Sequence, residues 1–145
     1  MAYVMLRLMT VEDNIHFRQV FKHALLCEFP SIQVIEAGNG QEAFKKLASY
    51  PIDLIFMDIS LPEENGLELS RKIKAKHRDI PIIIVTSYDL PEYRQAAIKC
   101  GASGFIGKFS LNMENISGVI KCHREAKQNG RKPICLGFAS GEVGI

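Results

Sequence analysis

Short apolar runs alternate with longer segments of mixed polarity along most of this chain. Each apolar run has the length of a β-strand, and the runs cover residues 4–11, 32–37, 52–58, 82–85 and 103–106. The third and fourth runs are almost uninterrupted, which is typical of strands that are buried on both faces. We therefore expect a sheet whose two sides are both covered.

The segments between these runs show helical spacing of apolar residues. In the first of them one apolar face is expected, and Asn14 can cap the helix start. The residues of that face are Phe17, Val20, Phe21, Ala24 and Leu25. Further helices are expected over residues 40–50, 67–78, 91–100 and 111–126. Gly118 lies inside the last helix and should weaken it by about 1 kcal/mol relative to alanine.

The order strand–helix therefore repeats five times. Alternation with short connections predicts an α/β fold with one doubly wound, five-stranded parallel sheet, helices on both faces and right-handed crossovers. The pattern ends near residue 126. We expect residues 1–126 to form a single domain and residues 127–145 to form a linker-like C-terminal tail.

Size, composition and charge narrow the class of protein. The chain has 145 residues, of which 47% are hydrophobic and 23% charged, as in an ordinary globular domain. The net charge of +2 gives no indication of nucleic-acid or membrane partners. No apolar run reaches the ~18 residues of a membrane span, and the N-terminus lacks the order of a signal peptide. We expect a cytoplasmic protein.

The four cysteines give no metal or disulfide signature. They are Cys27, Cys100, Cys122 and Cys135, with no C-x-x-C pair and no histidine at zinc spacing. A chain with this much core does not need a disulfide framework, so we expect reduced, partly buried cysteines.

Polar residues follow four of the five expected strands. Glu12 and Asp13 follow the first, Asp58 ends the third, Thr86 follows the fourth and Lys108 follows the fifth. Because the carboxyl ends of parallel strands share one edge of a sheet, these side chains should converge. Three carboxylates repel one another unless a cation intervenes, and an oxygen-only ligand set suits Mg²⁺. A metal beside Lys108 would attract a phosphoryl group, with Asp58 as a possible nucleophile and Thr86 as a donor.

Each of these residues also has a simpler interpretation. Asp58 could cap its loop, Thr86 could cap a helix, Lys108 could be a surface lysine, and Glu12 and Asp13 could favour a helix dipole. All five falling on one edge is hard to explain in this way, which favours a functional site.

The motifs in this order resemble the receiver domain of two-component response regulators, over roughly residues 3–125. They are Glu12-Asp13, Met57-Asp58 with Pro62 and Gly66, Val85-Thr86-Ser87, and Gly101-Ala102-Ser103-Gly104-Phe105 leading to Lys108. The resemblance implies a flavodoxin-like (βα)5 fold. It also implies a domain that catalyses its own phosphorylation, and slow autodephosphorylation at most, rather than an enzyme with an external substrate.

The resemblance assigns roles around Asp58. This residue would accept a phosphoryl group from a histidine kinase or a histidine phosphotransfer protein. Asp13, Asp58 and the backbone carbonyl of Ser60 would ligate Mg²⁺, and Glu12 would bind through a metal-bound water. Lys108 would contact the phosphoryl oxygens.

The resemblance also implies a switch. Thr86 would contact the phosphoryl oxygens together with Lys108, and Phe105 would turn inward as Thr86 moves, although a buried Phe105 is equally compatible with an ordinary core residue. The surface of the last two helices and the last strand would then bind or release a downstream protein partner or an output domain missing from this chain. Phe109 stands where the family usually has proline, which leaves the isomer of the Lys108–Phe109 bond open.

Three alternatives remain. A small aspartyl-phosphate phosphatase would commonly carry a second acid two residues after Asp58, where this chain has Ser60. A nucleotide or flavin binder would need a glycine-rich loop in place of residues 11–14. A degenerate receiver that serves only as an interaction module would not need the complete set of acids, Thr86 and Lys108. The pattern does not distinguish a stand-alone receiver from the first domain of a longer regulator.

Overall fold

The computed structural model describes residues 5–130, in which strands and helices alternate as expected. The strands are β1 (Arg7–Val11), β2 (Gln33–Ala37), β3 (Leu54–Met57), β4 (Ile82–Thr86) and β5 (Gly104–Gly107). The helices are α1 (Ile15–Glu28), α2 (Gly40–Ser49), α3 (Gly66–Lys76), α4 (Pro91–Lys99) and α5 (Met113–Gln128), with a 3-10 turn, η1, at Lys108–Ser110.

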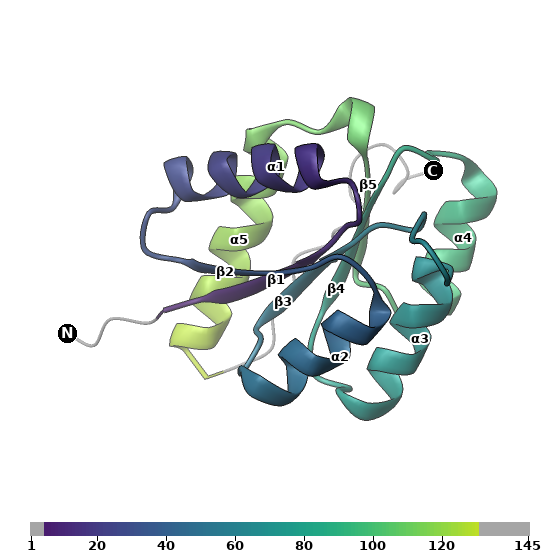
Figure 1. The fold of residues 1–145 in the computed structure, drawn as a ribbon. Coiled ribbons are helices and arrows are strands. Elements are labelled where there is room, and N and C mark those ends of the chain that lie inside the picture. The colour runs from purple at the N-terminus through teal and green to yellow at the C-terminus, as the bar shows by residue number, and fades with distance from the viewer. Residues whose placement is uncertain (1–4, 131–145) are drawn as a thin grey trace.

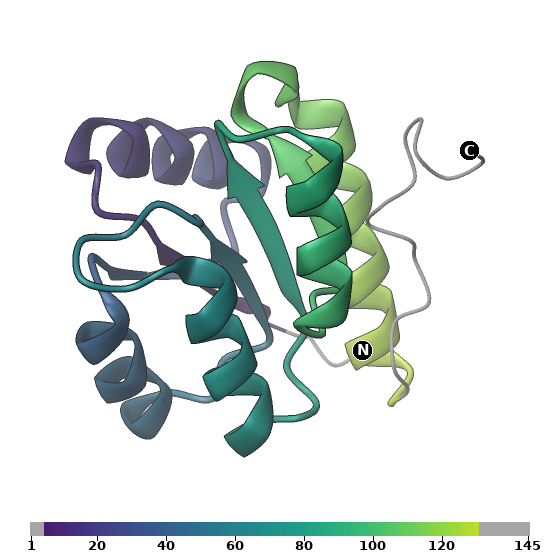
Figure 2. The same ribbon diagram turned by 90° about the vertical axis from the view of Figure 1, so that its right-hand side faces the viewer.

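All five strands are parallel and form one sheet in the order β2-β1-β3-β4-β5. The predicted doubly wound α/β fold is confirmed. Helices α1 and α5 cover one face of the sheet, and α2, α3 and α4 cover the other (Figures 1 and 2). β3 lies at the centre, between β1 and β4, so the loop that follows it emerges in the middle of the sheet edge.

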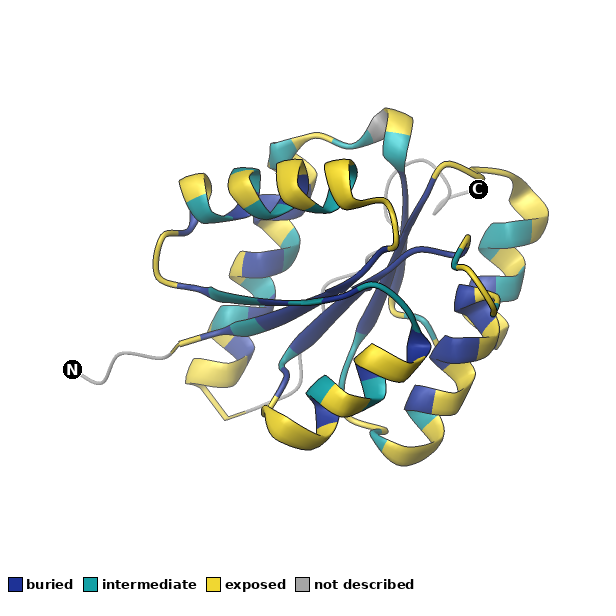
Figure 3. Cartoon of the chain, in the orientation of Figure 1, coloured by how far each residue is buried: buried dark blue, intermediate teal, exposed yellow. Residues whose placement is uncertain are grey.

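Two apolar cores result from the alternation of side chains along each strand. Met9 and Ile55 point to the face covered by α2, α3 and α4, whereas their neighbours Leu8 and Phe56 point to the face covered by α1 and α5. Figure 3 shows the inner strands as continuously buried, whereas the edge strand β2 is mostly of intermediate burial. This explains why the third and fourth apolar runs have no polar face.

Local signals set the helix ends. Asparagine side chains cap the N-termini of four helices, namely Asn14, Asn39, Asn65 and Asn112. Pro91 occupies the first turn of α4, and Gly101, with a φ of 91°, follows its end. None of the helices in residues 5–130 has the length and apolar character to cross a bilayer.

Some details differ from the expectations. α5 continues to Gln128, two residues past the predicted end, and most of the predicted tail lies outside the described residues. The first strand begins at Arg7, whereas Val4 lies outside the described residues. The Lys108–Phe109 peptide, whose isomer was left open, is trans.

The prediction of reduced, partly buried cysteines was wrong for Cys27, which is exposed, and for Cys122, which is not reduced. Cys27 is exposed and free, and Cys100 is buried and free, but Cys122 on α5 is disulfide-bonded. Pairing depends on which segments meet after folding, and the spacing of cysteines along the chain carries no such information. Cys135 lies outside the described residues.

Candidate functional site

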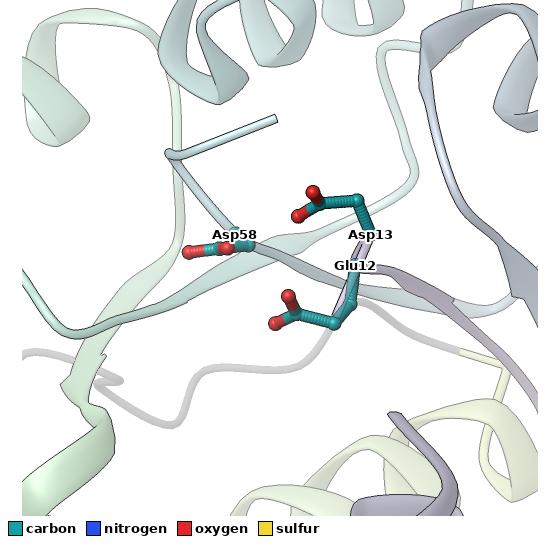
Figure 4. Close-up of side chains that lie close together, drawn as sticks. All are labelled: Glu12, Asp13 and Asp58. Atoms are coloured by element: carbon teal, nitrogen blue, oxygen red, sulfur yellow. The ribbon is translucent and has the colours of Figure 1, made fainter. Parts of the chain in front are cut away.

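Three carboxylates meet where β1 and β3 end. Val11 pairs with Met57 in the parallel register, so the residues that follow them emerge side by side. Glu12, Asp13 and Asp58 each offer a carboxylate oxygen within 4.8 Å of the others (Figure 4). The convergence expected for the carboxyl ends of parallel strands is therefore present for these three residues.

The loop after β3 folds back tightly on Asp58. The N–H of Gly66 donates to the carbonyl of Ile59 at 2.7 Å, and Ser60 forms an antiparallel bridge with Asn65. A Cβ at Gly66 would clash with the backbone carbonyl of Asp58. Glycine is needed here for close backbone approach, and the closed loop holds Ser60 beside the carboxylates.

Lys108 reaches the carboxylates from the end of β5. Its Nζ lies 2.8 Å from Oε1 of Glu12 and 3.6 Å from Oδ2 of Asp58, and its side chain is 16% exposed. The other carboxylate oxygen of Glu12 accepts from the N–H of Asn14 at 3.0 Å. Glu12 is thus well satisfied, and the ammonium offsets part of the negative charge of the cluster.

Asp58 is less well satisfied. The residue is 5% exposed, and its Oδ1 has no hydrogen-bond partner among the described residues. Burial, and then the neighbouring Glu12 carboxylate, raise the pKa of Asp58 from 3.8 to about 6, although Lys108 and a hydrogen bond from the backbone of Ser60 act to lower it. A buried oxygen without a partner is unfavourable and suits an incoming ligand.

A cavity of ≈490 Å³ opens in front of these groups. Its walls also include Asn14, Leu61, Pro62 and Ser87. An adjacent cavity of ≈440 Å³ lies on the other side of the loop after β3 and is lined partly by Tyr88 and Tyr93, whose ring centroids are 5.6 Å apart. Asp58 is therefore approachable although its own side chain is buried.

The two expected switch residues are both buried and do not line this cavity. Thr86 is fully buried, and its Oγ1 accepts from the N–H of Tyr88 at 3.2 Å. Ser87, which the sequence argument did not single out, lines the cavity. Phe105 is 2% exposed, and the guanidinium carbon of Arg94 lies 4.8 Å from its ring centroid. The structure thus brings Glu12, Asp13, Asp58, Ser60 and Lys108 to one cavity, whereas Thr86 and Phe105 are buried in the neighbouring strands β4 and β5.

The family follows from comparison with known proteins. The family model of the response regulator receiver domain matches residues 8–121 of the sequence. This is most of the chain, and it includes all of the site residues described above. The chain belongs to this family. The resemblance noted from the motifs is therefore confirmed.

This chain is similar in sequence and in fold to individual response regulators. The chain is 34% identical over 128 residues to the two-component response regulator ORR41 of Oryza sativa subsp. japonica, covering 87% of this chain and 100% of that protein. The solved structure of response regulator TrrA from Thermotoga maritima, in complex with Mg²⁺ and BeF, superposes with a TM-score of 0.72 at 32% identity, covering 82% of this chain and 99% of that one.

Other relatives are longer. The chain is 30% identical over 104 residues to the transcriptional regulatory protein DegU of Brevibacillus brevis, which is 71% of this chain but 44% of that protein. It spans 28% to 54% of the length of four of the curated relatives that it matches. The shared part is the receiver domain.

Proposed function

We propose that Asp58 accepts a phosphoryl group from a phosphohistidine donor in a Mg²⁺-dependent reaction. The observation that carries this proposal is the state of Asp58, a buried residue that lines the cavity together with Glu12, Asp13 and Lys108. One oxygen of its carboxylate has no hydrogen-bond partner within residues 5–130. A structural carboxylate would have its hydrogen bonds satisfied within the fold. A carboxylate awaiting a metal and a phosphoryl group would not.

The donor set fits Mg²⁺. The three clustered side chains supply oxygen and no nitrogen or sulfur, which favours a hard cation. Asp13, Asp58 and the backbone carbonyl of Ser60 would hold the ion, and Glu12 would bind through a water. When bound, Mg²⁺ supplies charge neutralisation for the transferred group. The presence of Mg²⁺ and BeF in the similar TrrA structure supports this assignment.

The remaining residues act on the phosphoryl group. An oxygen of Asp58 forms the new bond to phosphorus as the phosphorus–nitrogen bond of the donor breaks, and the leaving imidazole nitrogen keeps the electron pair and takes a proton. The ammonium of Lys108 then pairs with a phosphoryl oxygen. Thr86 would exchange its hydrogen bond with Tyr88 for a donated hydrogen bond to another phosphoryl oxygen.

The output is a change in protein contacts. A phosphoryl group that draws Thr86 toward the cavity would alter the packing of Phe105 and the outer surface of α4, β5 and α5. The donor would be a histidine kinase or a histidine phosphotransfer protein, and the recipient a downstream partner or an output domain. On this proposal residues 1–126 are the signalling unit, which phosphorylates itself and has no external substrate.

Intact mass spectrometry tests the proposal. The protein and its Asp58→Asn variant are incubated with a small phosphodonor such as acetyl phosphate, with Mg²⁺ or with a chelator. We expect the mass of one phosphoryl group on the wild type only, and only with Mg²⁺. Wild-type protein that gains no mass under any condition would refute phosphoacceptance and favour an interaction module, and equal gain in Asp58→Asn would place the acceptor elsewhere.

A further inference from the structure

We propose that Phe17 is a positioning residue for Lys108, holding the ammonium at the phosphoacceptor site through the face of its ring. The inference rests on the proposed function for its consequence, but the contact itself is independent of it. Nζ of Lys108 lies 4.2 Å from the centroid of the Phe17 ring. This is the shortest of the five cation–π contacts among residues 5–130, the others being 4.8 to 5.8 Å.

The ring of Phe17 is itself fixed from two directions. Its backbone N–H donates to the capping oxygen of Asn14 at 3.0 Å, which places the residue in the first turn of α1. Its ring stacks on Phe21 at 5.7 Å, and Phe21 meets Phe56 of the central strand edge-on at 5.2 Å. A row of three aromatic rings therefore connects the core beside β3 to the ammonium of Lys108.

The ring and the carboxylates contact Lys108 in different ways. Glu12 and Asp58 attract the ammonium by charge, at 2.8 and 3.6 Å, whereas Phe17 attracts it through the negative face of a neutral ring. Because the side chain of Lys108 is only 16% exposed, water screens its attraction to the carboxylates and to the Phe17 ring only in part.

The difference matters when a metal binds. A divalent cation competes with Lys108 for the carboxylates of Glu12 and Asp58 and repels its ammonium, but it does not compete for the aromatic face of Phe17. The cation–π contact is therefore the part of the Lys108 environment that metal binding leaves in place. Phe17 would keep the ammonium within reach of the phosphoryl oxygens at the step where its ion pairs are lost.

The contact can be measured without any phosphorylation. Protons on Cε of Lys108, assigned by their loss in Lys108→Met, should be shifted upfield by the Phe17 ring in carbon–proton correlation spectra of the metal-free protein. The shift should vanish in Phe17→Leu and persist in Phe29→Leu, a matched control at the other end of α1. An unshifted Lys108 resonance in the wild type would overturn the proposal.

The consequence is tested by the rate of labelling at saturating Mg²⁺. We expect Phe17→Leu to lower the rate about three- to tenfold, as fits a partly desolvated cation–π contact. Phe17→Tyr, which keeps the ring face, should restore it, and Phe17→Leu should have no further effect in a Lys108→Met background. The affinity for Mg²⁺ should stay constant or rise in Phe17→Leu, because the repelling ammonium is freed.

Two outcomes would overturn the positioning role. Phe17→Leu could lower the labelling rate equally in both backgrounds, or it could weaken Mg²⁺ binding as much as labelling, and either result would indicate general loosening of the site. A wild type that takes no label with or without Mg²⁺ would instead refute the proposed function. In that case the spectroscopic test alone would decide whether Phe17 positions Lys108.

Discussion

Replacing Asp58 by asparagine should stabilise the metal-free protein at neutral pH, although Asp58 is the centre of the proposed site. The residue is 5% exposed and lies in a cluster with Glu12 and Asp13, and one of its carboxylate oxygens has no hydrogen-bond partner in the described part of the chain. Lys108 compensates this charge only in part, at 3.6 Å. An amide of nearly the same shape has no charge to bury.

The magnitude follows from the pKa of Asp58. Burial and the charge of Glu12 raise that pKa from 3.8 to about 6 in the folded protein. The folded state therefore binds the proton more tightly than the unfolded state. The resulting stability is fully present below the unfolded pKa and is lost as the pH rises through about 6, by roughly 3 kcal/mol in total.

The assay is urea unfolding in a chelator at about pH 5 and about pH 8. Between these pH values the titration of Asp58 should lower the free energy of unfolding of the wild type by roughly 1–1.5 kcal/mol. The difference in free energy of unfolding between Asp58→Asn and the wild type should therefore grow by that amount toward high pH. Asp53→Asn is the control. Asp53 pairs with Lys127 at 2.9 Å and accepts from the N–H of Arg7, so its replacement should destabilise the fold at both pH values. An advantage of Asp58→Asn that is constant or shrinks with pH would refute the reasoning.

Three further predictions concern the metal and two glycines. Mg²⁺ at about a hundred times its dissociation constant should raise the free energy of unfolding by about 2.7 kcal/mol, and Asp13→Asn should lose most of this gain. An unchanged melting temperature of the wild type with Mg²⁺ would argue against the metal site. Gly118→Ala should raise the free energy of unfolding by about 0.5–1 kcal/mol in urea, because a Cβ at this position of α5 would meet no side chain or neighbouring element of residues 5–130 within 4 Å. A loss of stability would contradict this. Gly66→Ala should lower the free energy of unfolding by about 1–3 kcal/mol in the same assay, because its Cβ would clash with the carbonyl of Asp58. An unchanged free energy of unfolding would show that the loop after β3 can move away.

The fold could be predicted because its signals are local and repeated. Uninterrupted apolar runs such as Ile82–Val85 occur only where both faces of a strand are covered, and α/β alternation leaves few possible topologies. The helix ends were accessible for the same reason, since Asn14 and Pro91 act within one turn of their own positions. The order of strands was implied by the family resemblance and not by the pattern.

The convergence of the candidate residues could be predicted because a parallel sheet brings the carboxyl ends of its strands to one edge. That argument places backbones, so it succeeded for Glu12, Asp13 and Asp58, which directly follow paired strands. It does not give side-chain directions. Ser87 rather than Thr86 lines the cavity, because Thr86 is turned into the protein and bonded to the backbone of Tyr88.

Contacts between distant segments were beyond the sequence argument. The ring of Phe17 was assigned to the apolar face of a helix, and only the structure places it against Lys108, which is far away in the sequence. The disulfide at Cys122 was missed for the same reason. Both depend on which residues meet after folding, which periodicity does not encode.

On the proposed function, the arrangement of β4 and β5 offers a route by which a change of charge at Asp58 could move side chains on the surface of α4. Thr86 pairs with Gly107, directly before Lys108, so the two groups proposed to contact a phosphoryl oxygen end adjacent strands. Two residues back along β5, Phe105 is covered by Arg94, whose guanidinium also pairs with a carboxylate of the β4–α4 loop at 2.9 Å. A hydroxyl drawn into the cavity would leave space beside Phe105, and a close-packed core cannot keep such space empty. On the proposed function, the ring of Phe105 and with it Arg94 on α4 would then adjust, which would convert a local change in charge into a change of surface.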